Sequence, residues 1–163
     1  MDRRPDPVQP ADAGAGALAL SLMAGAGHAA LAYTDAGDGA PAISRIAFGL
    51  DPAGVPVTLI SALAPHQAGL KASPACAVML GEPGAKGDPL THPRLMIRAE
   101  AQFVAPDDPA RPALRDHWLE HHPKSKLYID FPDFAFVRLV PRSALLNGGF
   151  ARAFRLSPED LRA

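Results

Sequence analysis

Proline and glycine divide this chain into short segments, and that division limits the folds open to it. The sequence contains 18 prolines and 14 glycines among 163 residues. Both residue types interrupt helices and mark turns, so long helices should be few. Between the breaks lie short runs of apolar and β-branched residues, of which 57–60 (VTLI) is the clearest. The pattern predicts a mainly β fold with a few helices added.

The expected strands are separated by turn sequences such as DAGDGAP (35–41) and DPAGV (51–55). The predicted strands cover residues 28–34, 42–50, 56–61, 75–80, 94–104, 133–140 and 145–156. The predicted helices cover residues 13–24, 66–72, 107–122 and 124–131. This order shows no internal repeat and no glycine-rich nucleotide loop. It indicates a small barrel with flanking helices and not a doubly wound sheet.

A single domain is expected. Residues 1–10 are charged and proline-rich, which predicts a mobile tail, and residues 11–163 should fold together. Lys and Arg number 16 against 17 Asp and Glu, so the charge gives no reason to expect nucleic acid or an anionic membrane as a partner. The only cysteine, Cys76, lies in an apolar run, and no signal peptide or membrane-spanning run is visible. These features favour a cytoplasmic protein.

The stretch 59–74 (LISALAPHQAGLKASP) carries the most chemistry. A buried strand should end at Ser61, and a short helix should begin near His66. A helix N-terminus offers unpaired N–H groups and favours negative charge. Ser61, His66 and Lys71 would add a hydroxyl, an imidazole and a cation, which together suit a phosphate. The alternative is an ordinary strand-to-helix turn in which Ser61 and His66 act as caps.

Charged residues elsewhere have two interpretations. Arg45 follows Ser44 in a predicted strand, so it either holds an anionic ligand or forms a salt bridge at a barrel rim or subunit interface. Asp88, His92 and Arg94 lie in a proline-stiffened loop. That loop either shapes a ligand site or is held by an Asp–Arg pair at an interface, and the second interpretation is favoured.

Three histidines lie near the end of a predicted helix. His117 and His121 are four residues apart and so share a helix face, with His122 beside them. No further well-spaced ligand follows, so a solvated helix end is favoured and no native metal site is expected. Trp118 and Leu114 should face the core.

Four segments together resemble a known family: SRIAFGLDPAGVPVTLISALAPHQAGL, GDPLTHPRLMIRAEAQFV, HPKSKLYIDFPDFAFVRL and LLNGGFARAFRL. They are similar to the FMN-binding split-barrel family, the pyridoxamine 5′-phosphate oxidase-like proteins, and specifically to its haem-iron-utilisation branch. The similarity runs from about residue 28 to residue 156. It implies a six-stranded split β-barrel with flanking helices. It also implies a homodimer with two FMN sites at the subunit interface.

The resemblance also implies a cofactor site made of Ser44, Arg45, Ser61, His66, Gln67 and Lys71. Ser61 and His66 belong to the family motif S-x-L-A-x-H-T-x-N-L, with the His at the phosphate end. Here the motif Thr is Gln67 and the motif Asn is Gly69. Gln67 can still donate a hydrogen bond, but Gly69 has no side chain with which to do so.

The main functional expectation is an FMN-binding flavoprotein, an oxidoreductase of unknown substrate. The C-terminal motif of true pyridoxamine phosphate oxidases, a Trp followed by R-x-H, is not visible, so that activity is not expected. Longer haem-utilisation relatives carry a second domain after the GGF segment, which lies close to the end of this sequence. The alternative expectations are a haem-handling protein that uses His117 or His121, or a cofactor-free binding protein.

Overall fold

The computed structural model describes residues 6–162. Its strands are β1 (Val8–Pro10), β2 (His28–Thr34), β3 (Pro41–Ala47), β4 (Gly49–Leu50), β5 (Pro56–Ser61), β6 (Ala75–Leu80), β7 (Arg94–Phe103), β8 (Phe134–Asn147) and β9 (Ala153–Leu156). Its helices are α1 (Ala13–Gly25), α2 (Pro65–Ala72) and α3 (Arg111–His121). Short 3₁₀ turns are η1 (Pro89–Thr91), η2 (Pro123–Leu127) and η3 (Glu159–Leu161).

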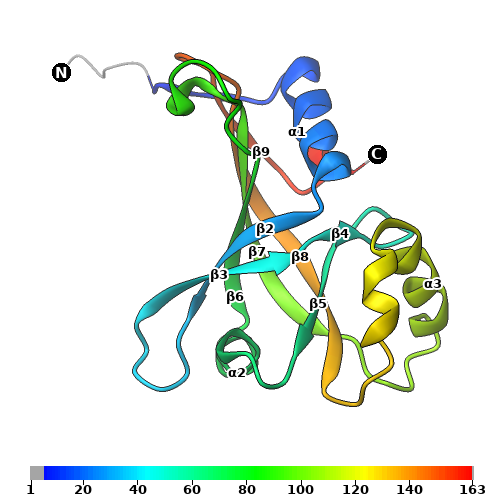
Figure 1. The fold of residues 1–163 in the computed structure, drawn as a ribbon. Helices are drawn as coiled ribbons and strands as arrows, with labels where there is room; N and C mark the ends of the chain where they lie inside the picture. Colours follow the sequence, from blue (N-terminus) through cyan, green and yellow to red (C-terminus); the bar gives the residue numbers. More distant parts are fainter. Residues whose placement is uncertain (1–5, 163) are drawn as a thin grey trace.

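The strands form one mixed sheet in the order β1-β9-β8-β7-β6-β2-β3, and β5 joins it through β8 while pairing with β4. β8 runs most of the height of the molecule (Figure 1). It pairs with β7 and with β5, and so connects the main run of strands to the β4–β5 pair. Its register with β7 shifts where Arg98 faces Ser143 and Ala99 faces Pro141. Such a bulge bends a strand and accommodates a proline inside it. The sheet therefore curves into an open barrel.

Two apolar clusters pack on opposite faces of this sheet at β5 and β8. α1 begins at Asp12, whose carboxylate accepts the Ala15 N–H at 2.7 Å, and it buries Ala15, Ala19 and Met23 against the strands. α3 buries Leu114 and Trp118 in a second cluster with residues of β5 and β8. In Figure 1 α1 lies beside the upper part of the sheet and α3 lies against β5, while α2 lies at the lower end.

The predicted strands at 28–34, 56–61 and 75–80 are confirmed with the same bounds. The split-barrel fold is confirmed too, but the described residues hold nine strands and not six. The short strand β1 was not predicted, and the strands expected at 42–50 and 145–156 are each divided. The strand expected at 145–156 is interrupted by a turn between β8 and β9, where Gly149 has φ 129°. Glycine suits that turn because other residues are strained at positive φ.

The expected tail also differs. Val8–Pro10 pair in parallel with β9, and Asp6 lies 2.7 Å from Arg155, so the described part of this segment is held by the sheet. Residues 1–5 lie outside the described residues. The helix expected from residue 107 begins at Arg111, and the one expected at 124–131 is only the turn η2. Within residues 6–162 no helix has the length and apolar character needed to cross a membrane.

Candidate functional site

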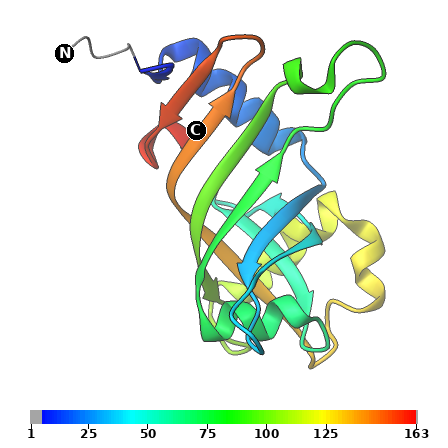
Figure 2. The same ribbon diagram turned by 90° about the vertical axis from the view of Figure 1, so that its left-hand side faces the viewer.

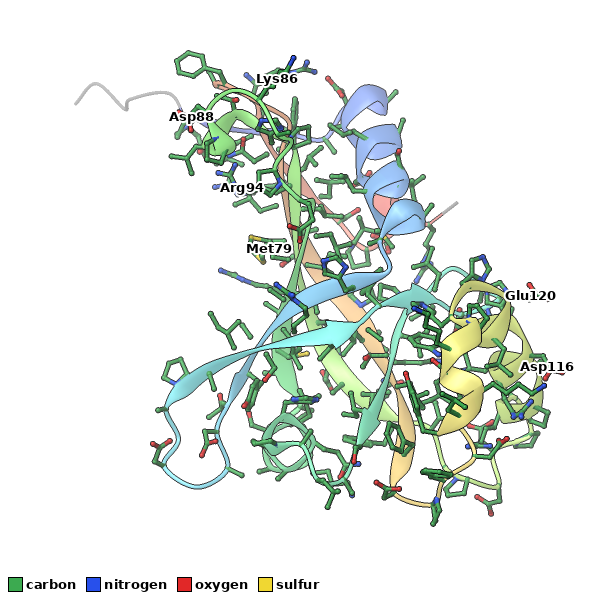
Figure 3. All side chains as sticks on the ribbon, viewed as in Figure 1. Met79, Lys86, Asp88, Arg94, Asp116 and Glu120 are labelled. Carbon is green, nitrogen blue, oxygen red and sulfur yellow. The ribbon has the colours of Figure 1, made fainter. Side chains whose placement is uncertain are left out.

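The outer surface of β2, β3, β6, β7 and the C-terminal part of β8 carries no helix (Figure 2), and we call it the uncovered face. Residues paired directly across strands point to the same face. Ile43, Met79 and Leu145 therefore lie on this uncovered face, and they are 76%, 48% and 37% exposed. Figure 3 shows Met79 directed away from α1 and α3. The same face carries Ala30, Ala32, Ala77, Arg45, Met96 and Arg98. Contiguous exposed apolar surface is typical of interaction sites in other proteins.

A shallow hollow of about 240 Å³ lies at the edge of the uncovered face. It is lined by two of the predicted site residues, Ser44 and Arg45, and by apolar side chains that include Ile43. His28 also lines it, and the His28 Nε2 atom lies 3.1 Å from a carboxylate oxygen of Glu82. The structure thus brings a cation and an imidazole together beside an apolar floor.

The start of α2 differs from the predicted phosphate cradle. The Ser61 hydroxyl donates to the Asp133 carboxylate at 2.9 Å and accepts the Leu63 N–H at 3.1 Å. A carboxylate at this position repels a phosphate. Ser61 therefore acts here as a link between β5 and the segment before β8, and no local sequence pattern indicates a partner 72 residues away.

The remaining predicted residues are spread along α2. His66 lies edge-on to Tyr33, with ring centroids 6.0 Å apart, and burial lowers the pKa of its imidazole. Gln67 is buried. Lys71 lies in the last turn, with its ammonium 5.4 Å from the centre of the Phe103 ring. Because an eight-residue helix is about 12 Å long, Lys71 does not join Ser61 at the helix start.

Gly69 has a packing role that its place in the motif did not reveal. A Cβ atom at this position would lie 2.6 Å from both the carbonyl oxygen of Thr34 and an edge carbon of Tyr33. Real side chains do not approach that closely, so glycine lets α2 lie directly against β2. The change from Asn in the family motif is therefore tied to the fit of this helix.

The proline-stiffened loop is held locally. Asp88 accepts the Leu90 N–H at 2.9 Å, and Arg94 donates to the Leu90 carbonyl at 2.9 Å. The expected Asp–Arg pair is therefore wrong for this chain, because both side chains bond the backbone of the same turn. His92 accepts the Gly84 N–H at 3.0 Å and fixes the preceding segment.

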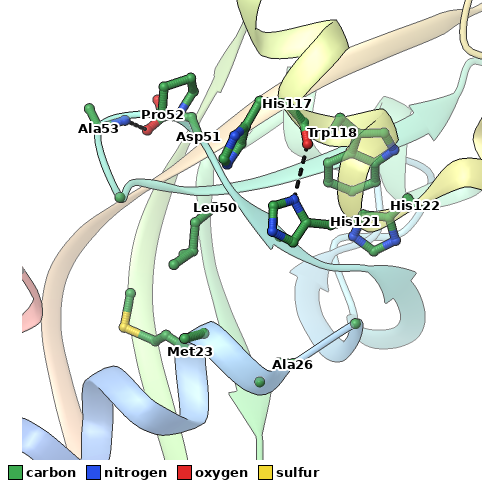
Figure 4. Close-up of a pocket in the computed structure, with 15 residues that line it drawn as sticks. Met23, Ala26, Leu50, Asp51, Pro52, Ala53, His117, Trp118, His121 and His122 are labelled. Carbon is green, nitrogen blue, oxygen red and sulfur yellow. Dashed lines mark hydrogen bonds between the residues drawn. The ribbon is translucent and has the colours of Figure 1, made fainter.

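A larger cavity of about 590 Å³ lies between the end of α1, the β4–β5 turn and α3 (Figure 4). The fifteen described residues that line it include His117, His121 and His122 but no Lys or Arg. Its floor at the turn is formed by Asp51, which accepts an ion-pair hydrogen bond from Arg138 at 2.9 Å. The cavity therefore offers imidazoles without a free cation among its described lining residues.

His122 has a structural role in this cavity. Its Nε2 atom donates to the Phe48 carbonyl at 2.9 Å, and its ring stacks on Trp118 with centroids 4.0 Å apart. Burial lowers the pKa of this imidazole. Trp118 and Leu114 are fully buried, which confirms their predicted place in the core.

Comparison with known proteins supports the split-barrel fold. A protein of the pyridoxinephosphate oxidase family from Clostridium acetobutylicum, related to general stress protein 26, shares the fold with a TM-score of 0.68 at 12% identity, over 93% of this chain and 99% of that one. A haem-binding protein from Mycobacterium smegmatis superposes with a TM-score of 0.80 at 28% identity, over 94% of this chain and 61% of that one. The chain belongs to the FMN-binding split-barrel family.

The haem-utilisation branch of the family is also confirmed. The chloroplastic non-canonical haem oxygenase HOZ of Arabidopsis thaliana is 34% identical over 124 residues. That match covers 75% of this chain but 36% of the plant protein, so the chain spans about a third of the length of this curated relative. No model of a known protein family matches the sequence.

Proposed function

We propose that this split-barrel protein binds haem as a homodimer, in the hollow beside Arg45 and His28 on the uncovered face. The observation that carries the proposal is the combination of a cation, an imidazole and an apolar floor in one hollow. Haem is a planar apolar group with two carboxylate arms, so it needs those three kinds of contact. The haem proteins among the relatives support haem as the planar group.

A second copy of the chain would complete the site. The hollow measures about 240 Å³, whereas small-molecule sites usually occupy about 300–1,000 Å³. Ile43 and Met79 are exposed on the same face and need cover. A homodimer through this face would bury them and close the hollow at its open side. One interface would therefore both cover the exposed apolar side chains and complete the binding site.

Five residues that line the hollow have a role in the proposed site. Arg45 would pair with a propionate, and Ile43 and Met79 would offer apolar contact to the ring. His28 is the candidate iron ligand, since a carboxylate such as Glu82 can orient an imidazole for metal binding. Haem supplies redox chemistry at its iron, while the protein binds and orients it.

FMN is the second candidate, and an oxidoreductase reaction would accompany it. The observation in its favour is that Ser44 and Arg45, which the family resemblance assigns to the flavin, both line the hollow. Against it stands the Asp133 carboxylate on Ser61, at the end where the flavin phosphate is expected. Haem avoids that conflict because its carboxylates can be directed toward Arg45 and away from Asp133.

A haem titration of the purified protein, followed through the Soret band, tests the proposal. Arg45→Ala should weaken binding about tenfold or more, since a hydrogen bond to a charged group contributes about 1.5–3 kcal/mol. His28→Ala should shift the Soret maximum because the iron would lose its ligand. The matched controls are His117→Ala and His121→Ala, which should titrate like the parent protein. If His117→Ala and His121→Ala lost the Soret change while Arg45→Ala and His28→Ala bound haem normally, the result would contradict the proposal. Haem would then bind in the larger cavity.

A further inference from the structure

We infer that α3 carries a divalent transition-metal site formed by His117, Glu120 and His121 at the edge of the larger cavity. Sequence alone favoured a solvated helix end at this place. The structure adds geometry to the spacing, because one ligand atom from each of the three side chains lies within 4.8 Å of the others. The site is separate from the hollow at Arg45 and would take Zn²⁺ or a similar ion.

The spacing on the helix places all three groups on one side. Residues three and four positions apart are neighbours on a helix surface. The His117 Nδ1 atom lies 3.8 Å from a Glu120 carboxylate oxygen, and the His117 and His121 rings have centroids 4.9 Å apart. Zinc bonds of about 2.0–2.1 Å in tetrahedral geometry put ligand atoms about 3.3 Å apart. Small rotations of partly exposed side chains bring these groups to that separation.

A backbone hydrogen bond prepares His121 as a ligand. Its Nδ1 atom lies 3.1 Å from the His117 carbonyl oxygen, which can only accept, so Nδ1 carries the proton (Figure 4). The Nε2 atom then holds the lone pair that a metal needs. Metal-binding histidines commonly donate their second N–H in this way, which fixes both the tautomer and the ring orientation.

The cavity accounts for the remaining coordination position. His117 and His121 both line it, together with Met23 and Leu50 (Figure 4). Zinc sites with three protein ligands keep a fourth position for water or a small ligand. Two imidazoles and one carboxylate suit Zn²⁺ and related ions better than Ca²⁺ or Mg²⁺, which prefer oxygen ligands. A small anion that enters the cavity is therefore the expected fourth ligand.

Binding of Zn²⁺ to the tag-free, chelator-treated full chain tests this site, measured by competition with a chromophoric chelator. The parent protein should bind one Zn²⁺, and His117→Ala and His121→Ala should each weaken binding at least tenfold. Glu120→Gln should weaken Zn²⁺ binding less, because an amide oxygen can still coordinate the ion, although more weakly than a carboxylate does. His92→Ala, a histidine in the loop after β6, is the matched control and should bind normally.

Circular dichroism of each variant would separate loss of ligand from loss of fold, which is not expected at these surface positions. The inference would be overturned if the parent protein failed to bind Zn²⁺. It would also be overturned if both His117→Ala and His121→Ala bound it as tightly as the parent. Haem binding at the hollow should be unchanged by either substitution, so the two sites can fail independently.

Discussion

Gly69 in α2 approaches Thr34 in β2 so closely that an added Cβ atom would lie 2.6 Å from the Thr34 carbonyl oxygen. Gly69→Ala should therefore lower the free energy of unfolding by about 1–3 kcal/mol, the usual cost of overpacking. Urea unfolding at neutral pH measures the change. Gly25→Ala is the matched control, because an added Cβ there meets no atom within 4 Å. If Gly69→Ala were as stable as that control, the close packing of α2 on β2 would be wrong.

Asp51 and Arg138 form a nearly buried ion pair under the β4–β5 turn, since the Asp51 side chain is 5% exposed. The other Asp51 oxygen accepts the N–H groups of Ala53 and Val55 at 2.9 Å. Asp51→Ala leaves Arg138 and the turn without their partner, so we expect a loss of about 3 kcal/mol in unfolding free energy.

Asp51→Asn separates the two contributions of Asp51. The amide oxygen can still accept from the turn, so the loss should fall to about 1–2 kcal/mol. Asp116→Asn, on the exposed side of α3, should change stability by less than about 0.5 kcal/mol. Chemical unfolding of the three variants gives these values. Equal losses for Asp51→Ala and Asp51→Asn would show that the charge and not the turn dominates.

His66 should make the protein less stable in mild acid. Burial lowers the pKa of its imidazole below the ordinary 6.5, so the unfolded chain takes up a proton more readily than the folded one. Stability attributable to His66 is full above pH 6.5 and decreases as the pH falls through the lower, folded-state pKa. His66→Gln should flatten the decrease in melting temperature between pH 7 and pH 5. An unchanged pH profile would contradict burial of a neutral His66.

Ile43 should be central to the proposed dimer, because its side chain is 76% exposed on the uncovered face. Ile43→Asp places a charge in that interface and should raise the dimer dissociation constant at least tenfold, about 1.4 kcal/mol. Sedimentation velocity measures the effect. Leu127→Asp is the control, since Leu127 is equally exposed, at 79%, but lies in η2 beyond α3. If Leu127→Asp dissociated the dimer and Ile43→Asp did not, the interface would lie near η2 and not on the uncovered face.

The regular strands were predictable from sequence because each shows a short apolar pattern bounded by turn residues. β2, β5 and β6 have the expected bounds for that reason. Trp118 was recognisable as core from its spacing with Leu114. The short strand β1 was missed, since three residues carry no periodic signal and pair only because β9 lies beside them.

The site was harder to predict because distant partners decide its chemistry. Ser61 looked like a phosphate contact, but Asp133 occupies its hydroxyl. In the sequence, Gly69 differs from the family motif only by the loss of a hydrogen-bond donor. The packing of α2 on β2 shows that glycine is needed there for close approach of the helix. Ser44 and Arg45 do share a hollow, as the family resemblance implied, whereas His28 carried no motif and was missed. Burial and long-range hydrogen bonds set these roles, and neither follows from local spacing.

The most direct measurement of the central proposal is the visible absorption spectrum of the purified protein after incubation with haem, and separately with FMN, followed by gel filtration. We expect a Soret band that elutes with the dimer and a flavin that separates from the protein. Stoichiometric retention of FMN without retention of haem would contradict it, and would instead support the flavin at Ser44 and Arg45.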